Sequence, residues 1–590
     1  MSSTFVEKIF NATKGAIVFN RPELILTHDN SASIQKTFEQ MGGTDVQDPD
    51  QLVIVLDHNA PPTNAGVANT YHTIREFAKR QKISKFHDAG SGICHQIMAD
   101  YARPGMVIVG SDSHTCTAGA FNTLAAGIDR TEAAGLWLRG ETWFRVPETL
   151  KINLSGSLKQ GVYAKDLSLW IIGILGSAGA NYMSIEYHGK GVKSLTIADR
   201  MTLANLASEM GAKNAVFPPD QVLMDYLGEK MEGIWADEGA DYAHEIQIDL
   251  KDVYPLVAAP HHVDHVIALA EVAGTDIHQG VIGTCTNGRI EDLREAASML
   301  TGKKVKPGIQ LLVIPASREI CLQAIEEGLV TIFLKAGANV LSSSCGPCLG
   351  TGQGIPADGF RVLSSANRNF QGRMGNKNAE IYLASPAAVA LSAVHGKIKD
   401  PRKITGAEKF PYHRNNTGSA YLEEGENRRE KAIWDYSDCD SLNTDLMFAG
   451  NLTYKVLSSD PSGIIPHLFE GFDPKFAKEV QSGDIIVGGE NFGCGSSREH
   501  PSVGLAHVGI KAVIVKSINR IFYRSAINQG LPVIVHPDAV NAYRRGDHVE
   551  VDLSSGTITI EKYYFHFEAL PDKLMAILEM KGLVNWILNQ

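Results

Sequence analysis

Residues 484–500 read DIIVGGENFGCGSSREH, a short apolar run that passes directly into glycines and polar residues. The same arrangement occurs at LVIVLDHNA (residues 52–60), MVIVGSDSHT (106–115) and GVIGTCTNG (280–288). In open α/β sheets, ligands bind at the edge where the strands end and the helices begin. Helical patterns at residues 73–81 and 291–300 alternate with these runs. The fold class is therefore predicted to be α/β, with largely parallel sheets.

The chain has 590 residues, too many for one hydrophobic core, so we expect about three or four domains. Its 44% hydrophobic and 21% charged residues are ordinary for a globular protein. Residues 396–444 are charged, rich in Gly, Pro and Asn, and lack apolar periodicity, which predicts a linker. This linker would divide a body of residues 1–395 from a C-terminal domain of residues 445–590.

Charge and hydropathy restrict the partners. The net charge is −11 and there is no dense Lys/Arg block, which argues against nucleic acid or an anionic membrane as the partner. Residues 1–15 lack the apolar run of a secretory signal and fit a mitochondrial presequence poorly, so we expect a cytoplasmic protein. The most apolar stretch, residues 167–180, is short and contains Gly and Ser, which predicts a buried helix and not a membrane span.

Three of the eight cysteines form a pattern. Cys345 and Cys348 lie in the turn SSSCGPCLG (residues 342–350), where both sulfurs can face one point. A zinc knuckle would need a second such pair, which the sequence lacks, although a structural zinc or a redox pair remains an alternative. Cys285 follows a predicted strand, and three cysteines without a fourth favour a centre with one open coordination position. The isolated cysteines are expected to pack as small hydrophobes: Cys94, Cys116, Cys321 and Cys439.

Five motifs together resemble the aconitase superfamily, most closely its isopropylmalate dehydratase and homoaconitase branch. They are GTCTNGR (residues 283–289), SSSCGPCLG (342–350), SANRNFQGR (365–373), GSDSHT (110–115) and NFGCGSSREH (491–500). The resemblance implies a three-domain α/β body and a swivelling C-terminal domain, with the large and small subunits of the family joined in one chain. It also implies that Cys285, Cys345 and Cys348 hold a 4Fe-4S cluster whose fourth iron has no protein ligand.

The resemblance further implies the acid side of a dehydratase site. Removing water from a hydroxy acid needs an acid that protonates the leaving hydroxyl and a base that takes the carbon-bound proton. Asp57 and His58 would form the acid pair, with a carboxylate holding the imidazole in its protonated form. Four further residues match active-site positions of the family: His95, Asp112, His114 and Glu186.

The base side is the loop NFGCGSSREH. By resemblance, Ser496 is the alkoxide base, stabilised by backbone N–H groups and positive charge, and Arg498 clamps a carboxylate. A plain phosphate-binding turn is the structural alternative for this loop. The remaining predicted substrate-binding residues are His28, Ser113, Asn367, Arg368, Arg373 and Ser497.

Substrate choice in the family depends on a loop that follows a Thr-Asp-x-Ile-x-Pro type segment. The matching stretch here is SDPSGIIPHLFEGFDP (residues 459–474), with Ser462 or Asp460 at the aspartate position, and its loop from Phe469 to Phe472 contains no arginine. A third substrate carboxylate would then lack a cation, which favours a dicarboxylate with an apolar end. His28, where aconitases carry glutamine, favours the same branch.

The sequence therefore predicts a 4Fe-4S-dependent hydro-lyase or isomerase acting on an isopropylmalate-like or alkylmalate-like hydroxy-dicarboxylate. The alternatives are a homoaconitase or aconitase acting on a tricarboxylate, a non-catalytic iron-sensing RNA-binding relative, and a zinc-stabilised binding protein. Neither nucleic acid nor membrane is an expected partner. A monomer is compatible with the sequence, which leaves the oligomeric state open.

Overall fold

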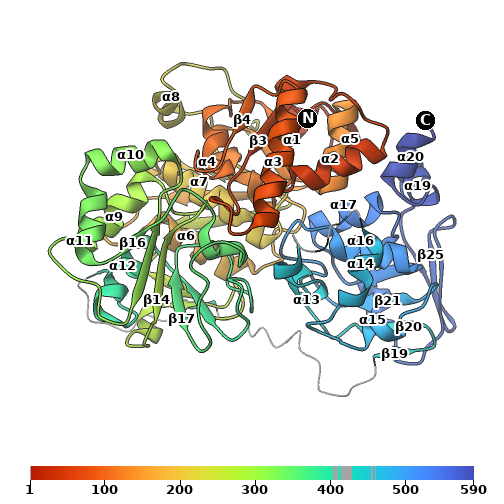
Figure 1. The fold of residues 1–590 in the computed structure, drawn as a ribbon. Coiled ribbons are helices and arrows are strands. Elements are labelled where there is room, and N and C mark those ends of the chain that lie inside the picture. Colours follow the sequence, from red (N-terminus) through yellow and green to blue (C-terminus); the bar gives the residue numbers. More distant parts are fainter. Residues whose placement is uncertain (1, 403–409, 413–427, 454–455, 457, 459) are drawn as a thin grey trace.

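The computed structural model describes residues 2–402, 410–412, 428–453, 456, 458 and 460–590. These residues form four larger sheets combined with helices, three in the body and one in the C-terminal part (Figure 1). The predicted α/β class is confirmed, because neighbouring strands within these sheets are mostly parallel. No helix among the described residues has both the length and the apolar character needed to cross a membrane.

The first sheet has five parallel strands in the order β4-β3-β2-β5-β6. The strands are β2 (Leu24–Thr27), β3 (Leu52–Val55), β4 (Lys85–His87), β5 (Val107–Gly110) and β6 (Leu124–Gly127). All strands except the edge strand β4 are buried at every position, as is typical of parallel strands covered on both faces. The main covering helices are α2 (Ser31–Gln40), α3 (Ala65–Arg80) and α5 (Arg130–Arg139). The helix predicted at residues 73–81 is the second half of α3.

The second sheet has four parallel strands, β8 (Thr149–Ser155), β9 (Ser184–His188), β10 (Asn214–Val216) and β11 (His244–Asp249). The apolar stretch at residues 167–180 contributes to α6 (Ala164–Leu175), which is buried over most of its length and packs on α7 (Ile197–Ala207). The prediction of a buried helix is thus confirmed for the part of the stretch that lies within α6.

The third sheet has seven strands in the order β13-β12-β18-β17-β14-β15-β16. Five strands are parallel: β14 (Gln279–Gly283), β15 (Gln310–Ile314), β16 (Asn339–Val340), β17 (Arg361–Ser364) and β18 (Glu380–Leu383). β12 (Leu256–Ala258) and β13 (Val266–Ala268) add an antiparallel edge. Helices α9 (Ile290–Leu300) and α12 (Pro386–His395) pack together against β14.

The C-terminal sheet begins earlier than predicted. Its order is β19-β20-β21-β22-β23, with β19 (Arg429–Glu430), β20 (Ile433–Tyr436), β21 (Ile485–Gly488), β22 (Ala512–Val515) and β23 (Val533–Val535). Strands β19 and β20 lie inside the stretch predicted as a linker, residues 396–444, so that boundary is corrected. The four residues of β20 are all buried, but the surrounding charged sequence hides so short a run. The predicted linker also includes residues 403–409 and 413–427, which lie outside the described residues.

Helix α17 (Arg520–Asn528) of the C-terminal part packs on α5 of the body (Figure 1). Arg524 and Glu132 form an ion pair across this contact, with both side chains almost completely buried. Asn528 donates a hydrogen bond to Asp129 over 2.7 Å. The C-terminal part is therefore docked against the body through polar groups that are shielded from water.

The last two helices, α19 (Asp572–Glu579) and α20 (Leu583–Leu588), also join the two parts. Helix α20 contacts α5, and α19 contacts α17. A hydrophobic cluster at this place combines Trp143 of the body with Ile527, Leu574 and Ile577. The end of the chain thus packs back onto the body, and the C terminus lies near α5 in Figure 1.

Candidate active site

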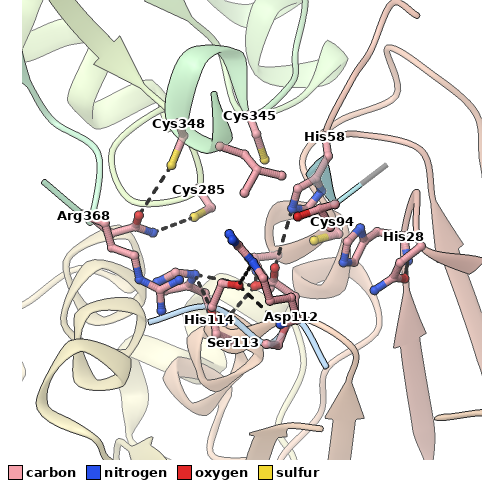
Figure 2. Close-up of a pocket in the computed structure, with 18 of the residues that line it drawn as sticks. His28, His58, Cys94, Asp112, Ser113, His114, Cys285, Cys345, Cys348 and Arg368 are labelled. Atoms are coloured by element: carbon pink, nitrogen blue, oxygen red, sulfur yellow. Dashed lines mark hydrogen bonds and ion pairs between the residues drawn. The ribbon is translucent and has the colours of Figure 1, made fainter. Parts of the chain in front are cut away.

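One pocket lies between the body and the C-terminal part, at the ends of strands β3, β5, β14 and β21. The predicted site residues that line it are His28, His58, His95, Asp112, Ser113, His114, Cys285, Cys345, Cys348, Asn367, Arg368, Arg373, Ser496, Ser497 and Arg498. Figure 2 shows the sulfurs of Cys285, Cys345 and Cys348 on one side of this pocket and the Asp112–His114 loop on the other. Segments far apart in the sequence therefore meet at one place, as the strand-end pattern predicts.

The three cysteines are buried and face polar donors. The Nδ2 groups of Asn367 and Asn205 each donate to the Sγ of Cys285 over 3.3 Å. Arg373 lies 3.9 Å from the Sγ of Cys348. Burial raises the pKa of Cys285 to about 12 and the pKa of Cys345 well above its usual value. A metal centre that binds these groups must therefore displace their protons, which makes its assembly pH-dependent.

The spacing of the donors distinguishes a cluster from a single ion. Metal–ligand bonds to zinc are about 2.0–2.3 Å long, so the donors of one ion lie close together. Among the described residues, the sets of donors within 4.8 Å of one another do not contain the three cysteines together. A polynuclear cluster, which separates its cysteine ligands, therefore fits these residues better than one zinc ion. N–H donors directed at the sulfurs are also typical of iron–sulfur sites.

His58 is held by carboxylates on both sides. Its Nδ1 lies 2.7 Å from Asp57 and its Nε2 lies 3.6 Å from Asp112. Asp57 also accepts a hydrogen bond from the backbone N–H of Cys94 over 2.7 Å. Burial disfavours the charged imidazolium, but Cys345, Asp57 and Asp112 outweigh it and raise the pKa of His58 well above its usual value. These neighbours favour the protonated form of the ring.

Asp29 positions this acid pair, although the sequence reasoning did not single it out. Its carboxylate accepts hydrogen bonds from the backbone N–H groups of Asp57 (3.0 Å), His58 (3.2 Å) and Asn59 (2.9 Å). The hydroxyl of Tyr71 donates to it over 2.7 Å. The loop after β3 thus has a fixed backbone. Only its place beside His28 in THDNS could have drawn attention to Asp29.

His28 stacks on His58, with ring centroids 4.0 Å apart. Its Nε2 lies 3.3 Å from the carbonyl oxygen of Ser111. Burial, together with the neighbouring His58, lowers the pKa of His28 to about 3. A neutral ring donates from Nε2 to this carbonyl and keeps a lone pair on Nδ1, which has no hydrogen-bond partner among the described residues.

The structure does not bring Glu186, a predicted active-site residue, to the pocket. Glu186 lies on β9, away from the pocket lining, where it accepts hydrogen bonds from the backbone N–H of Phe5 (2.8 Å) and from Tyr242 (3.1 Å). His188 also contacts its carboxylate, over 2.8 Å. These contacts give Glu186 a structural place that ties the N-terminal segment to the second sheet.

Glu209 is the glutamate that contacts the site. It lies 2.8 Å from the Nε2 of His114 and accepts from Arg368 over 2.9 Å. Burial opposes its charge, but Arg368 and His114 hold the pKa of Glu209 at about 2. Asp112 completes the network through His95, over 2.8 Å. Glu209 follows a helix and not a strand, so the strand-end pattern could not reveal it.

Lys165 forms hydrogen bonds with the backbone of the SANRNFQGR loop. Its Nζ donates to the carbonyl oxygens of Ser365 (3.0 Å) and Ala366 (2.5 Å), immediately before Asn367. Burial lowers the pKa of Lys165 to about 7, although Cys285 acts in the opposite direction. A buried cation next to the cysteines favours negative charge on their sulfurs. Nothing in the sequence around Lys165 marks it as part of a site.

The base loop places two donors on one hydroxyl. The Nε of Arg498 donates to the Oγ of Ser496 over 2.8 Å, and the backbone N–H of Arg498 lies 3.3 Å from the same oxygen. Gly493 and Gly495 have φ angles of +73° and +100°, which only glycine adopts readily, so this turn explains the GCG sequence. Ser497 donates to the carbonyl oxygen of Ser111 over 3.2 Å and thereby connects the base loop to the body.

The structure buries both ends of the predicted substrate loop. Phe469 and Phe472 are buried in the core of the C-terminal part, where Phe469 stacks on Tyr436. Asp460 begins a short helix, accepting from Gly463 over 3.3 Å, and Ser462 bonds to Asp460. Residue 459, the first of the quoted stretch, lies outside the described residues.

A different Thr-Asp pair contacts the base loop. Thr444 accepts a hydrogen bond from the backbone N–H of Ser496 over 3.0 Å, and Asp445 pairs with Arg498 over 2.7 Å. Thr453, a few residues further on, lines the pocket. The argument against a third substrate carboxylate, which relied on residues 469–472, therefore loses its basis.

Comparisons with known proteins identify the family of the chain. The aconitase family (aconitate hydratase) matches residues 4–276 and 270–396, and the aconitase C-terminal domain matches residues 470–538. The chain belongs to the aconitase family, which confirms the predicted aconitase-like fold class.

Similar proteins carry related names. The chain is 42% identical over 415 residues to "3-isopropylmalate dehydratase large subunit 1" of Methanopyrus kandleri, covering 68% of this chain and 99% of that one. It is 46% identical over 386 residues to "Probable methanogen homoaconitase large subunit" of Methanosarcina mazei, covering 64% and 98%. A solved 3-isopropylmalate dehydratase from Methanocaldococcus jannaschii is 41% identical, covering 25% of this chain and 87% of that one, with a TM-score of 0.23.

Proposed function

We propose that the chain is a hydro-lyase that removes water from a substituted malate and adds it back, and that it carries a 4Fe-4S cluster. The observation that supports this most is the single pocket that combines three buried cysteines, His58 with its Asp57 partner and the Ser496–Arg498 pair. The names of the related dehydratase and homoaconitase large subunits support the same reaction class.

Cys285, Cys345 and Cys348 would hold the cluster, which supplies a Lewis acid for the substrate hydroxyl when bound. Asn367 would favour the thiolate form of Cys285 because it donates an N–H to that sulfur, and the charge of Lys165 would act in the same direction. The three cysteines alone would not bring about the reaction. The surrounding acid and base do the proton transfers.

His58 would donate a proton to the leaving hydroxyl. Asp57 orients its ring and Asp112 faces its other nitrogen, so the Nε2 proton points into the pocket. His95 and His114 would bind the departing water, with their rings fixed by Asp112 and Glu209. Water exclusion comes from burial of these side chains.

Ser496 would take the proton from carbon. A serine alkoxide is normally too basic to form, but Arg498 donates from Nε and from its backbone N–H to the same oxygen. Arg373 would bind a substrate carboxylate, because its Nε and Nη1 have no partner among the described residues although both are buried. Ser497, Asn367 and Arg368 would complete the substrate contacts.

The single chain would contain both subunits of the related enzymes. The large-subunit relatives align with about two thirds of this chain, and a match to the C-terminal domain follows further on. Because Ser496 comes from the C-terminal part and the cysteines from the body, neither part alone contains the proposed machinery. The site forms only where the two parts meet.

The test is anaerobic purification of the full chain, measurement of iron and sulfide, and a screen of 2- and 3-hydroxy acids for the absorbance of an unsaturated product. We expect about four irons and four sulfides per chain and turnover of at least one substituted malate. A colourless protein with zinc and no sulfide would support the zinc-binding alternative instead. RNA binding that disappears on cluster assembly would support the iron-sensing alternative.

A further inference from the structure

Four arginines line the pocket, and two of them pair with carboxylates. Arg368 pairs with Glu209 over 2.9 Å, and Arg498 pairs with Asp445 over 2.7 Å. Arg373 lies 3.9 Å from the Sγ of Cys348. The fourth is Arg130, the first residue of α5, which the sequence reasoning did not single out.

Arg130 has a buried charge without a protein counterpart. Its side chain is only 6% exposed, and within the described parts of the chain it forms no hydrogen bond or ion pair. A buried guanidinium without an anionic partner is costly, since its desolvation is not offset. Such a group is retained where a ligand supplies the missing anion.

Three neighbours locate the guanidinium. Burial is the main cause that lowers the pKa of His28, Arg498 and His500, and the charge of Arg130 adds to each of these shifts. Arg130 therefore lies near both His28 and Arg498, which line opposite parts of the pocket, one from the body and one from the C-terminal part. Arg130 and the three cysteines line the same pocket.

The docked domains hold Arg130 in place. The next residue, Thr131, donates from its backbone N–H and its hydroxyl to Glu499, over 3.1 and 2.9 Å. Asp129 caps the helix through the N–H of Glu132 over 2.8 Å. The backbone of Arg130 is therefore fixed on both sides, and its carboxylate neighbours in the sequence bond to other groups.

We propose that Arg130 forms a subsite for a third anionic group, so that the substrate is a hydroxy-tricarboxylate and not an alkylmalate. This rests on the proposed hydro-lyase function and specifies its substrate class. The distal carboxylate would replace the missing partner of Arg130, while Arg373 and the Ser497–Arg498 segment bind the carboxylates next to the reacting carbons. An apolar distal group would leave the guanidinium buried and unpaired, which discriminates against isopropylmalate.

A pair of unreactive ligands tests the subsite without turnover. Tricarballylate and methylsuccinate differ only in one terminal carboxylate, and calorimetry on the anaerobic full chain measures both dissociation constants. We expect tricarballylate to bind at least about tenfold more tightly, and Arg130→Met to remove that advantage. Arg130→Lys should retain part of it, because the charge remains but the bidentate geometry is lost.

Turnover supplies the second measurement. The kcat/KM values for citrate, homocitrate and 3-isopropylmalate are compared in the wild type, Arg130→Met and a surface control, Arg80→Met. We expect Arg130→Met to lower the tricarboxylate values about 10–100-fold and to leave or raise the isopropylmalate value. Thermal unfolding and the visible spectrum of each variant check that fold and cluster are intact.

The two hypotheses fail differently. Equal binding of both ligands to the wild type, or an equal loss for both in Arg130→Met, would overturn the subsite. A wild type that binds tricarballylate selectively but turns over none of the hydroxy acids would reject the hydro-lyase and leave the subsite standing.

Discussion

The Nε of Arg498 donates a hydrogen bond to the Oγ of Ser496 over 2.8 Å, next to a turn in which Gly493 and Gly495 have positive φ angles. Asp445 holds the same guanidinium from the far side over 2.7 Å. The arginine is therefore fixed before any substrate arrives, and its charge lowers the cost of removing the serine proton. This relationship makes Ser496 the first residue to change.

Ser496→Ala should lower kcat by about 10²–10⁴-fold, the usual contribution of a positioned base. The visible absorbance should stay unchanged, because Ser496 does not contact the cysteines among the described residues. Anaerobic kinetics and spectra measure both. Cys345→Ser is the matched control, since it should remove the absorbance itself. Turnover that survives Ser496→Ala would exclude this residue as the base.

Asp57→Asn should shift the alkaline limb of the pH profile to lower pH. His58 acts in its protonated form, which exists below its pKa, so activity falls as pH rises through that pKa. Asp57 is one of the groups that raise the pKa of His58 above its usual value, and its loss lets the pKa fall. The measurement is kcat/KM against pH. Asp88→Asn, which changes a half-exposed carboxylate on the surface, should leave the limb in place.

Substitutions of Glu209 and Glu186 should have different effects, one on catalysis and the other on stability. Glu209→Gln should lower kcat/KM about 10–100-fold, because His114 and Arg368 lose their common partner. Glu186→Gln should leave kcat/KM unchanged and cost about 1–3 kcal/mol of unfolding free energy, because it weakens buried hydrogen bonds to Phe5 and Tyr242. Steady-state kinetics and denaturant unfolding distinguish the two. A kinetic defect in Glu186→Gln would restore it to the site.

Arg524→Met should destabilise the contact between the body and the C-terminal part by about 3–5 kcal/mol, because it leaves Glu132 buried and unpaired. KM should rise as well, since Ser496 and Arg498 reach the pocket only when the domains dock. The double variant Arg524→Met/Glu132→Met removes both charges and should recover most of the stability. If the single and double variants lose the same stability, the ion pair is not what holds the contact.

Strand ends made most of the site predictable. The loops after β3, β5, β14 and β21 contain Asp57, Asp112, Cys285 and Ser496, and parallel strands bring such loops to one edge. A local pattern was therefore sufficient to anticipate a three-dimensional arrangement. The burial of α6 could also be predicted from the sequence, because an apolar run of this kind is stable only in the protein interior.

Residues whose role depends on a distant partner were not identified from the sequence. Glu209 and Lys165 matter because of His114, Arg368 and the Ala366 carbonyl, which are more than 90 positions away in the sequence. Such pairings depend on how the sheets pack against one another, and they produce no periodic pattern in the sequence. Glu186 was assigned to the site by the family resemblance, whereas in the structure it bonds to Phe5 and Tyr242, and Glu209 contacts His114.

The substrate loop could not be located from the sequence for a different reason. Two Thr-Asp-like or Ser-Asp-like segments occur within about 20 residues, and only the contacts of Thr444 with the Ser496 backbone separate them. Arg130 was missed because an arginine in the first turn of a helix is electrostatically unfavourable, so nothing in the pattern suggests a buried one.

The packing of α20 onto α5, and of α19 onto α17, gives the enzyme a property that a two-subunit relative would lack. Both ends of the C-terminal part are anchored, one through the peptide chain and the other through Leu574, Ile577 and their neighbours around Trp143. Reassembly after a transient separation is intramolecular and does not depend on protein concentration. Specific activity should therefore hold constant on serial dilution, and the two halves of the catalytic machinery are always synthesised in equal numbers.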